Sequence, residues 1–119
     1  MDLYKLKLDK FNNILIKNFP KKYSLGIDSV NEDELIDVII YYIDEFDDVQ
    51  KFVSLCETVN LNKENRVIYV YEKGRKDKVN RDAIYEPFKT KEYKNFKMKA
   101  PMLCSLSDKL SAFVQQKIL

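Results

Sequence analysis

The segment from residue 35 to residue 56 carries the most regular apolar pattern in the chain. Apolar residues recur at i, i+3, i+4, i+7, i+8 and i+11, the spacing of one face of an α-helix. The first group is Leu35, Val38, Ile39, Tyr42, Ile43 and Phe46. The second group is Val49, Phe52, Val53 and Cys56, which resumes the period after Asp47 and Asp48. The pattern predicts a helical hairpin with a very short turn or one kinked helix, and we favour two helices.

Polar residues before this segment resemble the start of a helix. Ser29 precedes Glu32 by three positions and Asn31 precedes Glu34 by three, so either pair could form a capping box. Asp33 and its acidic neighbours would then lie in the first turn, where the helix dipole favours negative charge. These signals predict that the first helix begins near residue 32.

Residues 3–18 also show helical spacing. The apolar positions are Tyr4, Leu8, Phe11, Leu15 and Phe19, and Pro20 ends the run. We therefore expect an amphipathic helix over 3–18. Tyr4, Leu6 and Leu8 also alternate as in a strand, so the first one or two turns stay open between the two structures.

The rest of the chain mixes strand and helix signals. Residues 60–65 are polar and turn-like, and 66–72 is rich in β-branched and aromatic residues, which predicts a strand ending before Gly74. Asn80 is expected to cap a short helix over 81–85 that stops before Pro87. Residues 102–106 suggest another strand. Ser107 is expected to cap a last helix over 108–118, and 88–99 is ambiguous.

These elements predict an α+β fold in a single domain, residues 1–119. We expect a small helix-dominated domain of about four helices with a two- or three-stranded antiparallel sheet. No apolar run of about 18 residues is present, so no membrane partner is expected. Cys56 and Cys104 are isolated among apolar residues, and no export signal is apparent. Both features favour reduced, buried thiols and a cytoplasmic protein.

The composition disfavours most enzyme chemistry. The chain has no histidine, which removes the commonest general base and the commonest transition-metal ligand. Two cysteines cannot supply a four-ligand zinc site, and two glycines cannot form a dinucleotide or phosphate-binding loop. The sequence therefore predicts a non-enzymatic binding or regulatory protein without a cofactor or metal.

Charge is strongly segregated along the chain, although the formal net charge is only +2. Residues 28–58 hold ten acidic residues and one lysine, whereas residues 73–99 hold ten basic and four acidic residues. Such asymmetry indicates surfaces of opposite sign that can bind charged partners.

The basic segment is the favoured binding region, because its lysines alternate with aromatic residues. Lysines neutralise phosphates without reading sequence, and exposed aromatic rings stack on unpaired bases. On a strand, Phe96 and Met98 would face the core while Lys97 and Lys99 face solvent. The simpler interpretation is that the lysines only keep an exposed edge soluble. The candidate nucleic-acid-binding residues are Arg75, Lys76, Lys78, Arg81, Lys89, Lys91, Tyr93, Lys94, Lys97 and Lys99.

Two alternatives use other residues. An acidic helix face could imitate nucleic acid and inhibit a protein with a basic groove, as antagonists from mobile elements do. Its residues would be Asp33, Asp37, Asp44, Glu45, Asp47 and Asp48, and its simpler interpretation is a solvated helix face. A histidine-free ribonuclease toxin could instead use Arg75, Lys76, Lys78, Arg81, Tyr85 and Glu86.

Overall fold

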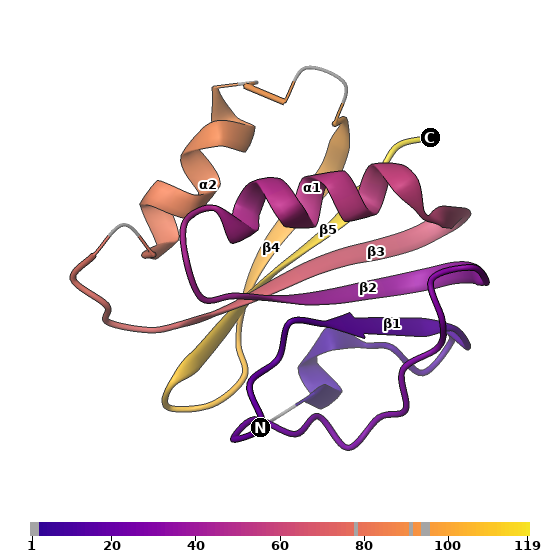
Figure 1. Ribbon diagram of the computed structural model, residues 1–119, viewed down its shortest axis with the longest axis horizontal. Coiled ribbons are helices and arrows are strands. Elements are labelled where there is room, and N and C mark those ends of the chain that lie inside the picture. Colours follow the sequence, from indigo (N-terminus) through magenta and orange to yellow (C-terminus); the bar gives the residue numbers. More distant parts are fainter. Residues whose placement is uncertain (1–2, 78, 91, 94–95) are drawn as a thin grey trace.

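A mixed five-stranded sheet forms the centre of the molecule, with strand order β1-β2-β3-β5-β4 (Figure 1). The computed structural model describes residues 3–77, 79–90, 92–93 and 96–119, and only the backbone of Ala100. The described elements are a 3₁₀ helix at Leu3–Leu6, β1 (Ile14–Lys17), β2 (Leu35–Ile43), α1 (Asp48–Thr58), β3 (Asn60–Glu72), α2 (Arg81–Lys89), β4 (Met98–Ser105) and β5 (Leu110–Lys117).

The expected helix-dominated fold with an antiparallel sheet is wrong, although the α+β class is correct. Strand residues outnumber helical residues in the described part of the chain. β1 pairs parallel with β2, and β2 pairs parallel with β3. β5 pairs antiparallel with both β3 and β4, so it is inserted between two strands that run in the same direction.

The largest correction concerns the expected helix over residues 32–46, because residues 35–43 form β2. All six residues from Val38 to Ile43 are buried, so both faces of this strand are covered. A strand that is buried on both faces is a continuous apolar run without alternation, and such a run also contains helical spacings. The β-branched residues Val38, Ile39 and Ile40 favour the strand.

The expected second helix, over 49–56, is confirmed as α1. It connects β2 to β3 and packs on one face of the sheet through Val49, Phe52 and Val53. Before the helix, the Asp48 carboxylate accepts hydrogen bonds from the backbone N–H groups of Asp44 and Glu45, both at 2.9 Å. These bonds hold the turn that leads the chain from β2 into α1.

The expected helix over 3–18 is wrong. A single 3₁₀ turn ends at Leu6, Lys7 has a positive φ of 55°, and Ile14–Lys17 forms the edge strand β1. The N-terminal segment lies instead against the second face of the sheet, where Leu6 and Leu8 are buried. Spacing alone misled here, because several of these apolar residues cover a sheet rather than form one stripe of a helix.

The predicted strand over 66–72 is confirmed but is longer at its start. Residues 60–65, expected as a turn, belong to β3, with a register shift opposite Ile36 and Val38. The expected last helix over 108–118 is wrong, because residues 110–117 form β5 between β3 and β4. Leu110 to Gln115 are all buried, which is again the signature of a strand with two covered faces.

The helix expected after Asn80 is confirmed as α2. The Asn80 side chain accepts a hydrogen bond from the backbone N–H of Ala83 at 2.9 Å. The helix does not stop before Pro87 but includes it and ends at Lys89. The predicted strand near 102–106 is confirmed as part of β4, the second edge strand.

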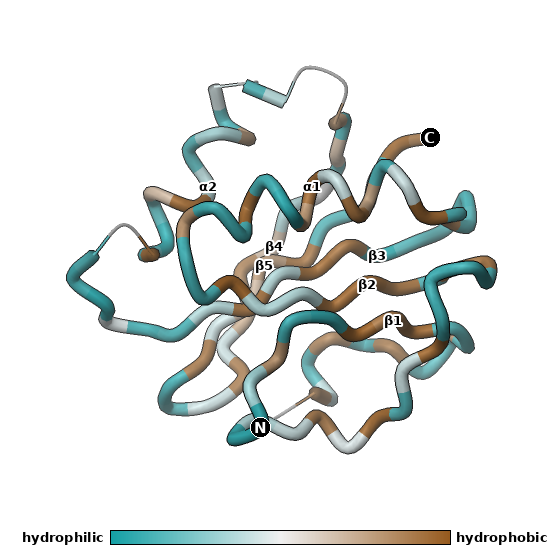
Figure 2. The backbone as a smooth tube through the Cα atoms, in the orientation of Figure 1, coloured by the Kyte–Doolittle hydropathy of each residue, from teal (hydrophilic) through white to brown (hydrophobic). Residues whose placement is uncertain are grey.

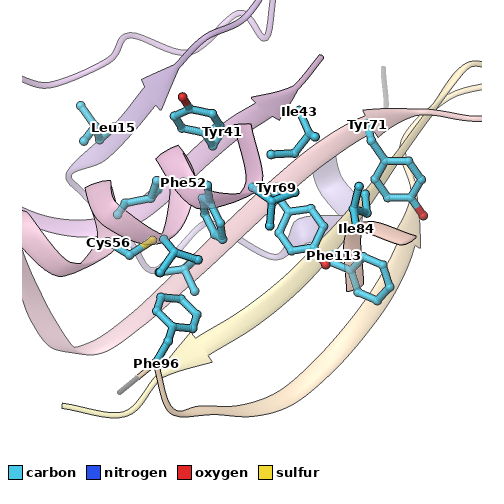
Figure 3. Close-up of a cluster of buried hydrophobic side chains, with 14 of the residues drawn as sticks. Leu15, Tyr41, Ile43, Phe52, Cys56, Tyr69, Tyr71, Ile84, Phe96 and Phe113 are labelled. Carbon is cyan, nitrogen blue, oxygen red and sulfur yellow. The ribbon is translucent and has the colours of Figure 1, made fainter. Parts of the chain in front are cut away.

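The central strands are largely hydrophobic along their length (Figure 2), and the sheet separates two apolar layers. On one face, α1 and α2 cover a cluster that includes Phe52, Tyr69 and Phe113 (Figure 3). On the other face, residues from the N-terminal segment and the connection between β1 and β2 cover Ile40, Ile68 and their neighbours. Cys56 and Cys104 are both buried and free, as the sequence predicted. No helix in the described ranges is long and apolar enough to cross a membrane.

Candidate nucleic-acid interface

An aromatic pocket opens between α2 and the start of β4. Its volume is about 540 Å³. The lining residues are Tyr85, Phe88, Tyr93, Phe96, Lys97, Met98 and Pro101. α2 supplies the first two rings, and β4 with the residues just before it supplies most of the rest. The pocket therefore joins two elements that follow one another in the chain.

Phe88 is the centre of the aromatic cluster around this pocket. Its ring stacks on Tyr69 with a centroid distance of 5.8 Å and an interplanar angle of 14°. It also lies 5.4 Å from Tyr93 and 5.6 Å from Phe96. Tyr93 is half-buried, and this burial, followed by the nearby charge of Glu92, raises the pKa of its hydroxyl. The ring cluster gives the pocket flat apolar walls of the kind on which bases stack.

One exposed lysine, Lys97, lines the pocket, and two further exposed lysines lie close to it in the sequence. Lys89 lies in the last turn of α2, directly after Phe88. Lys97 and Lys99 are exposed, whereas Phe96 is buried and Met98 packs against the core. Burial therefore alternates over 96–99 as predicted, although only Met98 and Lys99 of these residues belong to a strand. We call the pocket residues Tyr85, Phe88, Tyr93 and Phe96, with Lys89, Lys97 and Lys99, the lysine–aromatic surface.

The remaining basic candidates form a second group at the other end of α2. Arg75, Lys76 and Arg81 line a separate pocket of about 490 Å³. Lys78, Lys91 and Lys94 lie outside the described residues. The structure thus divides the predicted basic site into two groups that line different pockets.

Arg75 is engaged by acidic residues and offers little charge to an anion. Its guanidinium donates to a carboxylate oxygen of Asp77 and to the backbone carbonyl of Asp44, each at 2.6 Å. The hydrogen bond from Arg75 holds the pKa of the Asp77 carboxyl below its usual value. Arg81 likewise pairs with the adjacent Asp82 at 3.2 Å. The two arginines are thus partly neutralised, whereas within the described ranges Lys89, Lys97 and Lys99 form no ion pair.

The ribonuclease residues are not gathered around one pocket. Arg75, Lys76 and Arg81 line the second pocket, whereas Tyr85 lines the aromatic one. The Tyr85 ring stacks on Phe113 with a centroid distance of 4.8 Å and an angle of 7°. This ring therefore serves packing in the free protein.

The acidic candidates do not share a helix face, because the helix expected to carry most of them is β2. Asp37 lies near the beginning of this strand, and Asp44 follows its end. Seven residue steps along the strand separate them by roughly 23 Å, at about 3.3 Å per residue. Asp33 is exposed before β2, and Asp44, Glu45 and Asp47 are exposed after it.

Two of the acidic candidates hold the backbone in place. Asp48 is 5% exposed and binds the turn before α1. Burial alone would raise the pKa of Asp37, but hydrogen bonds from the Asn13 N–H, the Asn62 amide and the Asn12 N–H outweigh it and lower this pKa. Both carboxylates therefore have structural partners already. Among the residues that the structure describes, no cluster of acidic or cysteine side chains is arranged to hold a metal ion.

Sequence reasoning missed two buried polar groups near the aromatic pocket. The Gln115 side chain is 1% exposed, and neither its amide oxygen nor its amide nitrogen has a hydrogen-bond partner in the described part of the chain. The Tyr69 hydroxyl also lacks one there. A glutamine directly after the buried run from Leu110 to Val114 is the signal that could have indicated this site.

Comparisons with protein-family models, with curated proteins and with solved structures give no match for this chain. The functional argument therefore rests on the residues described above.

Proposed function

We propose that this chain is a non-enzymatic protein that binds single-stranded nucleic acid through the lysine–aromatic surface. The observation that carries the proposal is the aromatic pocket of about 540 Å³ that is lined by the exposed Lys97, with exposed Lys89 and Lys99 next to lining residues in the sequence. Aromatic stacking contributes about 1–3 kcal/mol per base and tolerates every base, because every base has a π-face. Lysines add attraction to phosphates that is independent of sequence.

The shape of the surface favours a single strand over a duplex. In a duplex the faces of the bases are stacked on one another, so a ring in a pocket cannot reach them. An unpaired base can turn into the pocket while a flanking phosphate meets Lys97, which lines it. Lys99 shares a sheet face with its partner Gln116, away from the pocket, and Lys89 lies at the end of α2, so these two lysines attract the strand at longer range. Lys89 lies at the end of α2, Lys97 just before β4 and Lys99 on β4, and all three are exposed.

The other candidate functions have weaker support. The acidic residues lie near opposite ends of β2, and Asp37 and Asp48 are engaged by backbone groups. The ribonuclease candidates line two pockets, and the chain has no histidine to act as a general base. We place the proposed binding activity in the cytoplasm, because both cysteines are buried and free, which is typical of reducing compartments.

The proposal is tested by fluorescence anisotropy with labelled 20-mers of single-stranded RNA and single-stranded DNA. Wild-type protein should bind at low salt, and affinity should fall steeply as salt rises. Each lysine that contacts a phosphate of a single strand contributes about 0.7 to the slope of log affinity against log salt. A variant with Lys89→Ala, Lys97→Ala and Lys99→Ala should therefore bind more weakly, with a slope shallower by about two.

The matched control replaces three exposed lysines of the N-terminal region by alanine, at Lys5, Lys7 and Lys21. It changes the net charge by the same amount as the test variant. This control should keep most of the affinity and slope. An equal loss in both triple variants would show that only overall charge matters and would contradict the proposed surface. Absence of binding to either nucleic acid at low salt would end the proposal.

A further inference from the structure

Gln115 lies on the helix-covered face of the sheet, beneath the aromatic pocket. Residues 111, 113, 115 and 117 of β5 share this face, and Phe113 belongs to the core under α2. The Lys117 ammonium lies 5.9 Å from the centroid of the Phe96 ring, which lines the pocket. Gln115 is thus flanked along β5 by two residues that contact pocket-forming rings.

The neighbouring strand β4 brings a pocket-lining residue opposite Gln115. β4 pairs Lys99 with Gln116 and Met102 with Val114, with a register shift between them. The bulge at residues 100–101 therefore faces Gln115, and Pro101 lines the pocket. Gln115 itself is 1% exposed, on the same sheet face as Phe113, which stacks on the pocket residue Tyr85.

The Tyr69 hydroxyl is the second unpaired group in this region. Tyr69 pairs with Phe113 and Val67 pairs with Gln115, so Tyr69 and Gln115 are diagonal neighbours on one face. Such neighbours lie about 7–8 Å apart, within reach of long side chains. Figure 3 shows the Tyr69 ring between Phe52 and Phe113, and Phe88 stacks on it from the pocket side.

A buried amide without partners costs stability, and native proteins contain few of them. Here a donor and an acceptor of one buried amide have no partner among the described residues, and neither does the hydroxyl of Tyr69 on the same sheet face. Apolar residues would fill the same space at lower cost. The polar groups therefore point to a ligand that is flat, apolar on its faces and polar along its edge.

We propose that the pocket binds one unpaired adenine base of a single strand, whose edge hydrogen-bonds the amide of Gln115. An amide offers one donor beside one acceptor, and this pair complements N7 and the N6 amino group of adenine. The base reaches the amide when the half-buried side chains of Phe88 and Met98 move apart, with its faces against the rings. This inference rests on the proposed function and adds base preference to it.

The experiment uses anisotropy to compare the affinities for ten-nucleotide oligo(dA) and oligo(dT), and for their RNA counterparts, at one fixed low salt concentration. Wild type should bind the adenine oligomer about tenfold more tightly, within the range for one bidentate contact to a base. Gln115→Leu should lose this preference but keep the salt-dependent binding of both oligomers. Gln116→Leu is the matched control, because its side chain lies on the opposite face of the same strand, and it should keep the preference.

Each other outcome overturns the inference in a distinct way. Equal binding of the two oligomers by wild type, a thymine preference, or an unchanged preference in Gln115→Leu would show that the amide does not read the base. Equal affinity for free adenosine monophosphate and for the oligomer would assign the pocket to a free nucleotide. Failure to bind any oligomer would end the proposed function itself, whereas salt-dependent binding without base preference would end only this inference.

Discussion

The side-chain amide of Asn65 makes both hydrogen bonds with the backbone of Lys117 that a paired strand residue would make. Its Oδ1 accepts from the Lys117 N–H at 2.9 Å, and its Nδ2 donates to the Lys117 carbonyl at 3.0 Å. Since β3 pairs Val67 with Gln115, this contact falls two positions further along the same register. A side chain thus extends the β3–β5 ladder beyond its last backbone pair.

Replacing Asn65 by leucine should destabilise the protein by about 2–4 kcal/mol, because it leaves the N–H and carbonyl of Lys117 without these partners. Urea denaturation measures the change. Asn60→Leu is the control, since Asn60 is exposed and should shift the free energy of unfolding by less than about 0.5 kcal/mol. Similar effects of the two substitutions would contradict the role given to Asn65.

Replacing Gln115 by leucine should have the opposite effect on stability. Gln115→Leu removes an unpaired buried amide and is expected to raise the free energy of unfolding of the free protein by about 1 kcal/mol. Gln115→Glu, of nearly the same shape, should lower it, because it buries a carboxyl group without a partner. Thermal unfolding in the absence of nucleic acid distinguishes the two. A destabilised Gln115→Leu variant would show that the wild-type amide is already satisfied.

Asp37 should make stability depend on pH on the acid side. Its pKa is lower in the folded protein than in the unfolded chain, so its stabilising effect is complete above about pH 4. This effect disappears as the pH falls through the folded pKa. Asp37→Asn should be less stable by about 1–3 kcal/mol at pH 7, and the difference should shrink below pH 4. Asp33→Asn, at an exposed position, should change neither the stability at pH 7 nor its dependence on pH.

The thiol of Cys56 should be unreactive in the folded protein. Burial raises its pKa well above the usual value, so almost no thiolate is present near neutral pH. Cys104 is also buried. A thiol reagent at pH 8 should therefore label neither residue in the native protein and both in urea. Fast labelling of the native protein would show that the packing around α1 opens readily.

The sequence predicted the elements whose signals are local. α1, the N-cap of α2 at Asn80 and the aromatic part of β3 all lie where the pattern indicated them. β2 and β5 were misassigned, because a strand buried on both faces and a buried helix share the same apolar spacing. Their covering layers come from distant parts of the chain, which no local pattern reveals.

The helix-start signals were chemically correct but belong to turns. The Asn31 N–H donates to the Glu34 carboxylate at 3.0 Å, as in a capping box, yet the chain continues into β2. Likewise the Ser107 hydroxyl accepts from the backbone N–H groups of Lys109 and Leu110, and the chain continues into β5. A turn of this kind can be followed by a helix or by a strand, and long-range packing decides which of the two forms.

The candidate site was predictable only in part. The alternation of lysines with Phe96 and Met98 was apparent from the sequence. The role given to Gln115 was not, because in the expected helix over 108–118 this residue would lie away from the apolar stripe. Only the insertion of β5 into the sheet places this residue on the helix-covered face, between Phe113 and Lys117.

That insertion also affects how the chain acquires its structure during synthesis on a ribosome. β3 and α2 emerge before β5, so the edge of β3 along residues 67–72 has no neighbour until the segment 110–117 follows. This edge is apolar, β-branched and aromatic, the composition that promotes pairing between different chains. The nascent protein therefore passes through a stage that is prone to aggregation, and chaperones would protect it until the last gap in the sheet is filled.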